Sequence, residues 1–339
     1  MIVKEEKRAL AIIFISIILL VLVSFVSLFL GRYSLTPLEV FRIINEKITG
    51  VITNKTAYKV VWDIRIPRVI LNILVGAGLA ASGAAFQGIF QNRLVSPDIL
   101  GVSNGAGFGV ALAMLLGSTL PFGVAPMAFV GGIVSVLITY SISKIKKDQS
   151  TLALVLSGIV VASFFSALIS LIKLVADTES VLPSITYWLM GSFVNVGYDK
   201  VIFATIFIGI GLLMLVLMRW KINVLSMGDE EAYTLGINPQ KNRIVIIIAC
   251  TIISATCVTV SGIIGWIGMI MPNICRECVT ANNKHLLPAS IVLGSLFMVT
   301  VDLIARCATA AEIPIGILTA IIGAPIFVFV FFKREGEKI

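Results

Sequence analysis

ALAIIFISIILLVLVSFVSLFL, residues 9–30, is a run of 22 residues without a charged side chain. A helix of about 20 apolar residues is long enough to cross the hydrocarbon core of a bilayer. Lys4, Lys7 and Arg8 precede the run, as basic residues do in a signal peptide, but the apolar core of a signal peptide has only about 7–15 residues. We therefore predict that residues 9–30 form a membrane-spanning helix that is kept in the mature protein.

The rest of the chain repeats this pattern. Of its 339 residues, 58% are hydrophobic and 13% are charged, and the mean hydropathy is +1.05. A soluble domain of this length could not keep so much apolar surface out of water. The sequence therefore predicts an all-α polytopic membrane protein, with a single transmembrane domain over residues 1–339. The ten predicted spans are 9–30, 69–90, 99–117, 122–142, 151–174, 201–218, 244–262, 264–277, 286–304 and 313–332.

An even number of spans puts both termini on one side of the membrane, and the basic residues indicate which side. With both termini in the cytoplasm, most lysines and arginines fall in cytoplasmic segments, as the positive-inside rule requires. The outer segment 32–68 is the exception, because it is also rich in basic residues. Segments 244–262 and 264–277 are the least regular spans, because glycines and Pro272 interrupt them. The net charge of +8 carries no signal for nucleic-acid binding.

Local signals place shorter features between and within these spans. In SLTPLEVFRII, residues 34–44, Thr36 can cap a helix whose first residue is Pro37, so we expect a short helix in the outer segment. Small residues that recur every four positions allow membrane helices to approach closely. Such repeats are Ala77, Ala81 and Ala85, and Gly101, Gly105 and Gly109.

The charged stretch SMGDEEAYTLGINPQKNR, residues 226–243, separates two apolar segments on the predicted cytoplasmic side. Acidic residues in the first turn of a helix are stabilised by the helix dipole, and a glycine often follows the last turn. A short helix in this stretch would have an acidic start, an apolar contact face and a glycine end. These parts are Asp229, Glu230 and Glu231, then Ala232, Tyr233 and Leu235, and finally Gly236.

Several kinds of chemistry lack the residues they need. The sequence contains no G-x-x-x-x-G-K-[ST] motif, so the chain is not expected to bind ATP through a P-loop. His285 is the only histidine, which argues against a histidine-dependent catalytic site and leaves a zinc site at Cys275 and Cys278 short of ligands. We interpret these two cysteines as small apolar residues of a membrane helix. No catalytic residue and no metal site is predicted.

At this point, long segments resemble a known family. They are WDIRIPRVILNILVGAGLAASGAAFQGIFQNRLVSPDILGVSNGAGFG (62–109), GIIGWIGMIMPNICR (262–276), HLLPAS (285–290) and VDLIARCATAAEIPIGILTAIIGAPIFVFVF (301–331). They closely resemble the FecCD-type permeases of ABC importers, the iron-siderophore and vitamin B12 group. The similarity extends from about residue 10 to the C-terminus.

The resemblance implies a fold and a set of partners. It implies ten helices per subunit, cytoplasmic termini, and a second copy of the permease (a homodimer) around a central pathway. Two ATPase subunits would dock from the cytoplasm and carry the ATP and Mg, so that this chain itself needs no cofactor. An extracytoplasmic substrate-binding protein would deliver the ligand. The loop 226–243 resembles the family's coupling element, whose short helices fit a cleft on the ATPase; the alternative is an ordinary solvated loop.

The resemblance also assigns roles to residues near the two membrane surfaces. Arg65, Arg68 and Arg306 match arginines that receive carboxylates from the binding protein in the vitamin B12 importer; the alternative is that they anchor helix ends. Positions that match the cytoplasmic gate of that relative are Asn92, Leu94, Ser150 and Thr151, which could equally be ordinary loop and cap residues.

One departure from the family concerns the segment after the glycines of span 264–277. The family usually has Pro-His there, whereas this chain has Pro272 and Asn273. The change casts doubt on any role that needs an imidazole at this position, and His285 lies too far along the chain to replace it.

The expected function is therefore that of an ABC importer permease for iron-siderophores, working by alternating access. Cobalamin, haem and oxyanions such as molybdate are alternative substrates. A secondary transporter or channel without an ATPase is the alternative class, but it needs an ionisable site within the membrane. The few carboxylates near the spans form no clear relay; they are Asp98, Asp302 and Glu312. A membrane enzyme has no candidate nucleophile and base.

Overall fold

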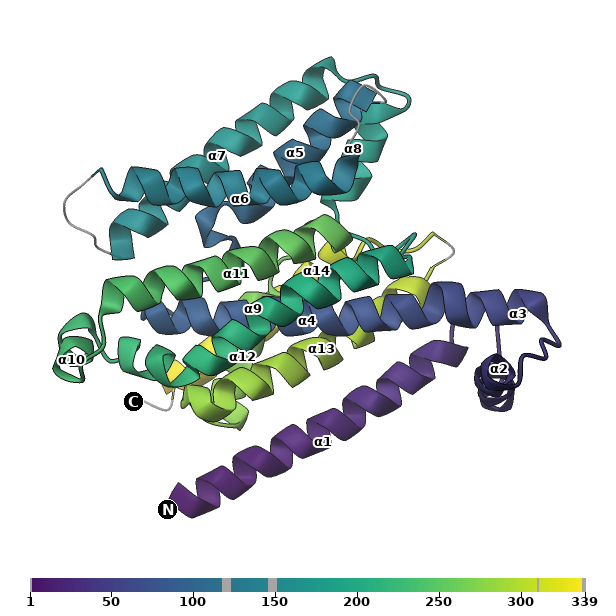
Figure 1. Cartoon of the computed structure of the whole chain (residues 1–339), viewed down its shortest axis with the longest axis horizontal. Helices are drawn as coiled ribbons and strands as arrows, with labels where there is room; N and C mark the ends of the chain where they lie inside the picture. Colours follow the sequence, from purple (N-terminus) through teal and green to yellow (C-terminus); the bar gives the residue numbers. More distant parts are fainter. Residues whose placement is uncertain (1, 118–122, 146–150, 310, 337–339) are drawn as a thin grey trace.

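The computed structural model of the chain describes residues 2–117, 123–145, 151–309 and 311–336, and within them all regular secondary structure is helical (Figure 1). The elements of the first half are α1 (Ile2–Phe29), α2 (Pro37–Thr49), α3 (Lys55–Lys59), the π-helix η1 (Val60–Arg65), α4 (Ile66–Ile89), the 3-10 helix η2 (Pro97–Leu100), α5 (Val102–Leu116) and α6 (Val124–Ser143). Those of the second half are α7 (Thr151–Val175), α8 (Val181–Leu189), α9 (Tyr198–Leu225), α10 (Asp229–Thr234), α11 (Pro239–Ser261), α12 (Ile267–Cys278), α13 (Asn283–Cys307) and α14 (Ile315–Gly336).

Each of the ten predicted spans coincides with a helix, but the helices differ in their ability to cross a membrane. Seven are long and apolar enough to do so, namely α1, the continuous segment from α3 to α4, α6, α7, α9, α11 and α13. The apolar parts of α5 and α14 are shorter, and α12 has only 12 residues. The described residues thus support seven spans by length and composition, while the count of ten remains a prediction.

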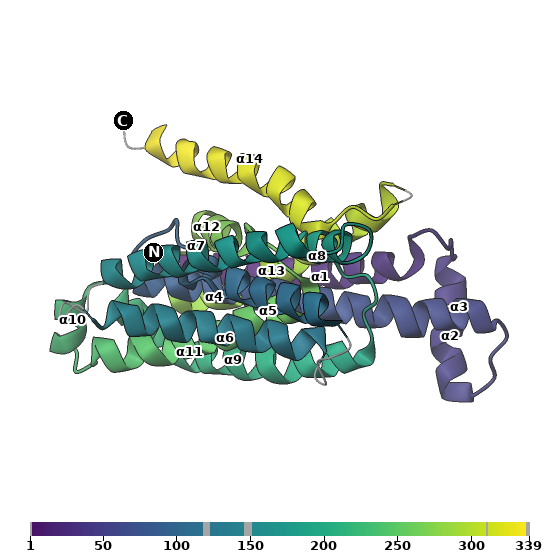
Figure 2. The same ribbon diagram turned by 90° about the horizontal axis from the view of Figure 1, so that it is seen from above.

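The two ends of the bundle differ in their secondary structure. The start of α1, the end of α14 and the short helix α10 lie at one end, on the left of Figures 1 and 2. Helices α2 and α3 lie at the opposite end. Following the charge distribution, we refer to the α10 end as the inner end and to the α2 end as the outer end. The cytoplasmic location of the termini remains a prediction.

Helix α4 lies in the middle of the bundle and is buried along almost its whole length. It packs against α9, α11, α12 and α13. Two of these contacts need glycine, because a Cβ on Gly83 would lie 1.7 Å from the carbonyl oxygen of Gly268, and one on Gly76 would lie 2.3 Å from that of Gly294. Backbones this close are typical of membrane helices packed through small residues.

Helices α5, α6, α7 and α8 form a separate group beside α4, α9 and α11 (Figure 1). Here the predicted glycine repeat lies at the contact between α5 and α6. A Cβ on Gly105 would lie 2.5 Å from the carbonyl oxygen of Gly131, and one on Gly109 would lie 2.1 Å from that of Met127. The prediction of close helix packing at this repeat is confirmed.

Two other local predictions are confirmed by hydrogen bonds and backbone angles. Helix α2 begins after Thr36, whose hydroxyl accepts from the Glu39 N–H at 3.3 Å, while the Glu39 carboxylate accepts from the Thr36 N–H at 2.7 Å. The break between α11 and α12 begins at Gly262, where φ is +71°, but Gly268 and Pro272 lie within α12 and do not interrupt it, so that part of the prediction is wrong. Helix α8 was not predicted, because its nine residues are too few for a span.

Candidate functional site

The inner end carries the predicted coupling helix. Asp229, Glu230 and Glu231 form the first turn of α10. The helix ends in a Schellman motif, in which the Gly236 N–H donates to the Tyr233 carbonyl at 3.0 Å and the Ile237 N–H donates to the Ala232 carbonyl at 2.9 Å. Gly236 has a φ of +75° there. The predicted helix and its glycine end are therefore present.

The apolar residues of α10 lie on two faces. Ala232 is completely buried against the rest of the chain, whereas the side chains of Tyr233 and Leu235 are 51% and 54% exposed. Met227, just before the helix, is 64% exposed. The surface that α10 offers to a partner therefore consists of Met227, Tyr233 and Leu235 beside the acidic first turn, and Ala232 does not belong to it.

An ion pair fixes α10 to the start of α11. Nη2 of Arg243 lies 2.7 Å from Oδ1 of Asp229, and the arginine is only 8% exposed. The Tyr233 hydroxyl also donates to Oε1 of Gln240. Asp229 thus has an internal partner, which the sequence did not indicate, while its position in the acidic first turn is as predicted.

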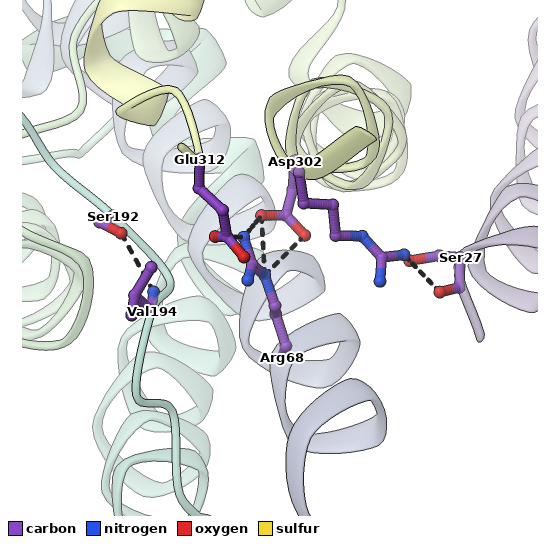
Figure 3. Close-up of polar contacts among 7 residues, drawn as sticks. Ser27, Arg68, Ser192, Val194, Asp302 and Glu312 are labelled. Carbon is purple, nitrogen blue, oxygen red and sulfur yellow. Dashed lines mark hydrogen bonds and ion pairs between the residues drawn. The ribbon is translucent and has the colours of Figure 1, made fainter. Parts of the chain in front are cut away.

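At the outer end, Arg68 forms a buried ionic cluster with two carboxylates (Figure 3). Its Nε and Nη2 donate to Oδ1 of Asp302 at 3.0 and 2.8 Å, and Nη2 also lies 2.9 Å from Oε2 of Glu312. The cluster joins α4, α13 and the segment that leads into α14. For a partner's carboxylate to bind Arg68, it must displace Asp302 or Glu312, of which Glu312 is the more exposed.

Arg65 and Arg306 donate to backbone groups near the end of α1. Arg65 donates to the carbonyls of Leu28 and Tyr33 at 2.6 and 2.5 Å, and Nη2 of Arg306 donates to the carbonyl and hydroxyl of Ser27. Both arginines are less than 8% exposed. They therefore anchor helix ends, as the alternative interpretation expects, and their role in docking stays a prediction.

The predicted gate residues lie on two different segments. Asn92 and Leu94 form a turn after α4, in which the Leu94 N–H donates to Oδ1 of Asn92 at 2.9 Å, and Leu94 is 52% exposed. Thr151 begins α7 and lines a cavity between α6 and α11. Ser150 lies outside the described residues. The described contacts do not bring Thr151 together with Asn92 and Leu94.

A polar network that the sequence did not reveal holds the turn after α4 against α12. The Asn273 side-chain amide donates to the Arg93 carbonyl at 3.0 Å, and the Gln87 amide donates to the Val95 carbonyl at 3.2 Å. Arg276 donates to Oε1 of Gln87 and to Oδ1 of Asn273. Asn273 therefore supplies both a donor and an acceptor at the position where the family usually has histidine.

The cysteines carry no sign of metal chemistry. Cys275 is buried beside Ala9, Leu286 and Ala289, whereas Cys278 is exposed. Among the described residues, no group of three or more His, Cys, Asp or Glu side chains could hold a metal ion.

Comparisons with known proteins identify the family. The model of the FecCD transport family matches residues 19–333. The molybdate import system permease protein of Haemophilus influenzae is 38% identical, over 94% of each chain. An iron chelatin transport system permease protein of Helicobacter pylori is 39% identical, over 82% of this chain and 83% of that protein.

The fold has a close match as well. A solved structure described as a metal-chelate type ABC transporter in an inward-facing conformation is 37% identical, with a TM-score of 0.85 over 95% of this chain and 99% of that one. The chain therefore belongs to the FecCD transport family and is a multi-pass protein of the plasma (inner) membrane.

Proposed function

We propose that two copies of this chain line a pathway that imports an iron-siderophore or a related metal chelate by alternating access. Membership of the FecCD family makes the chain a permease subunit of an ABC importer rather than an enzyme. ATP and Mg would bind to two separate ATPase subunits. Closure of the ATPase pair would pull on the loop 226–243 and tilt the helices between outward-facing and inward-facing states.

The observation that carries this proposal is the exposed surface of α10. A short helix with an acidic first turn and half-exposed Tyr233 and Leu235 has the mixed apolar and charged character of a protein-binding surface. The Arg243–Asp229 ion pair would transmit a pull on α10 directly to the long helix α11. Glu231 and Leu235 are the residues whose replacement should uncouple ATP hydrolysis from transport.

At the outer end, we propose that a binding protein docks through acidic side chains near Arg65, Arg68 and Arg306. The guanidinium group suits this role, because it pairs with carboxylates in a bidentate manner. A docking carboxylate would compete with Glu312 for Arg68. At the inner end, Asn92, Leu94, Ser150 and Thr151 would narrow the pathway.

The cargo has two leading candidates. Iron-siderophores are the first, since the relative from Helicobacter pylori, 39% identical over 82% of this chain, is described as an iron chelatin permease. Molybdate is the second, because the relative that is 38% identical over 94% of each chain is a molybdate permease. Cobalamin and haem are the remaining alternatives.

The test is to co-express the chain with the ATPase and binding protein encoded beside it, and to purify the complex. ATP hydrolysis is then measured with ferric siderophore, cobalamin, haem or molybdate present. Hydrolysis stimulated by one ligand would support the importer and name its cargo. A chain that purifies without an ATPase under gentle detergent would instead favour a secondary transporter or channel.

A further inference from the structure

Helices α6 and α11 pack against each other (Figure 2). A groove lies between their inner halves. It contains a cavity of about 330 Å³ lined by aliphatic side chains, Tyr140 and Thr251. The Thr251 hydroxyl donates to the Ile247 carbonyl of its own helix at 2.7 Å, so it is already satisfied. Leu137 and Ile248 line the cavity and are 58% and 48% exposed. The groove is therefore apolar and open to the surroundings.

Toward the inner end of the groove lies a smaller cavity of about 60 Å³, whose wall contains both apolar and polar side chains. Tyr140, Ile244 and Ile247 line both cavities, so the two cavities adjoin. The polar side chains of the smaller cavity come from the end of α6, the start of α7 and the start of α11. They are Ser143, Lys144, Thr151, Gln240 and Arg243.

Two basic groups in this smaller cavity have unused hydrogen-bonding capacity. The Lys144 ammonium lies 4.5 Å from the centroid of the Tyr140 ring and forms no ion pair with a described carboxylate. Arg243 is more than nine-tenths buried, and Asp229 binds only its Nη atoms. Its Nε is buried and has no partner among the described residues. The cavity therefore offers the exposed Lys144 ammonium to a negatively charged group, with the positive charge of the Arg243 guanidinium in its wall.

We propose that this groove binds a phospholipid with an anionic headgroup. An acyl chain would occupy the aliphatic cavity, and the phosphate would lie at the Lys144 ammonium, near the Arg243 guanidinium. Basic residues at the cytoplasmic surface attract anionic lipids, and basic pockets between membrane helices bind their headgroups. A free anion would leave the larger apolar cavity without an occupant. Because Arg243 also holds Asp229, the lipid would stabilise the base of α10. Its binding does not depend on the transport activity proposed above.

The test uses the full chain, with any partners that co-purify, in nanodiscs of equal parts phosphatidylglycerol and phosphatidylcholine. Native mass spectrometry after mild detergent release then counts the lipids retained on the protein. We expect the wild type to retain phosphatidylglycerol in preference to phosphatidylcholine. Lys144→Gln should reduce that preference by roughly fivefold, which corresponds to about 1 kcal/mol for one basic residue at the surface.

Two variants separate the headgroup from the acyl chain. Lys221→Gln removes a lysine from the inner part of α9 that lines neither cavity, and it should leave the lipid preference unchanged. Leu137→Trp should fill the apolar cavity and lower the retention of both lipids. Both variants change residues at least partly open to the surroundings, so the fold should tolerate them.

Several results would overturn the proposal. They are equal retention of the two lipids by the wild type, equal effects of Lys144→Gln and Lys221→Gln, and displacement of the lipid by millimolar inorganic phosphate. The last would make the smaller cavity a site for a free anion. A wild-type dimer without lipid would also overturn it, because a second copy of the chain would then be the better candidate to cover the groove.

Discussion

The Asp302 carboxylate is the most deeply buried charge of the outer cluster. Its side chain is 1% exposed and is held by Arg68, whereas Glu312, the second partner of Arg68, is 25% exposed. Removing one partner of a buried ion pair costs about 3–5 kcal/mol, because the other charge is left uncompensated. We expect Asp302→Ala to lower the free energy of unfolding by about this amount, and Glu312→Ala by about 1 kcal/mol or less. Thermal unfolding in detergent measures both.

Equal unfolding midpoints for Asp302→Ala and Glu312→Ala would contradict this ranking. Equal midpoints would mean that Asp302 holds Arg68 no more strongly than Glu312 does, so that a docking carboxylate could bind Arg68. A large difference would instead mean that Arg68 is bound mainly within its own chain, so that a binding protein must compete with Glu312.

Leu235, which directly follows α10, has a side chain that can be shortened without disturbing the fold. It is 54% exposed, and substitutions at such surface positions usually change stability by less than about 0.5 kcal/mol. An apolar anchor at a protein interface is worth about 1–2 kcal/mol or more. We expect Leu235→Ala to weaken binding of the ATPase roughly tenfold and to reduce transport accordingly. Binding of the ATPase to the purified permease in nanodiscs measures the effect.

Leu217→Ala is the matched control, because Leu217 is also exposed but lies within α9, away from α10. It should leave binding of the ATPase unchanged. Wild-type uptake and binding in a stable Leu235→Ala protein would remove the coupling role from this surface.

At the scale of the elements, the contact between α4 and α12 depends on the absence of a single methyl group. A Cβ on Gly83 would lie 1.7 Å from the backbone oxygen of Gly268, so the two helices would have to separate. Overpacking of this kind costs about 1–3 kcal/mol. We expect Gly83→Ala to lower the unfolding midpoint. Gly209→Ala on α9 should not lower it, because nothing lies within 4 Å of the position of its Cβ.

Comparing Gly83→Ala in α4 with Gly209→Ala in α9 separates the effect of helix packing on stability from the effect of helix propensity. Alanine favours a helix over glycine by about 1 kcal/mol, so Gly209→Ala is expected to be neutral or stabilising. If Gly83→Ala behaved in the same way, the close contact between α4 and α12 would not contribute to stability.

Features that depend only on residues a few positions apart in the sequence could be predicted from the sequence. The cap of α2 needs only Thr36 and Glu39, and the end of α10 needs only Gly236, so both were predicted correctly. The glycine repeat of α5 likewise predicted close packing. The number of spans was harder to predict, because α12 is apolar and has only 12 residues. Apolar character and length alone do not separate such a helix from a true span.

The contacts within the candidate sites could not be predicted in this way. Gln87 and Arg276 are 189 positions apart, and Arg68 and Asp302 are 234 apart. The family resemblance identified Arg68 as a candidate docking residue. Nothing in the sequence indicated that its guanidinium would form an ion pair with Asp302. For the polar network of Asn273, Gln87 and Arg276, the clearest signal in the sequence was Asn273 at the position where the family usually has histidine. The sequence alone did not indicate what Asn273 does.

Across the whole molecule, the two ends of α4 are held by different chemistry. The outer end is fixed by the buried ion pairs of Arg68, whereas the turn after the inner end is held by side-chain amides. Asn273 and Gln87 donate to carbonyls of this turn and accept from Arg276. Neutral hydrogen bonds contribute about 0.5–1.5 kcal/mol each, less than a buried ion pair costs to break. The turn after the inner end of α4 is therefore held less tightly than the outer end. A gate requires such a turn, because it must detach from α12 when the pathway opens.

We therefore expect Asn273→Leu, which keeps the size of the side chain but removes its hydrogen bonds, to release the turn that contains Leu94. The Arg93 carbonyl would lose its amide donor, and one such partly buried hydrogen bond is worth about 0.5–1.5 kcal/mol. A nitroxide label on Leu94→Cys, in a background without the exposed Cys278 and Cys307, reports the motion of the turn. The label should become more mobile in Asn273→Leu. It should stay close to wild type in Asn273→His, since an imidazole can still donate one hydrogen bond. Unchanged mobility in Asn273→Leu would show that Gln87 alone holds the turn, whereas increased mobility with a passive leak of substrate would identify the turn as the inner gate.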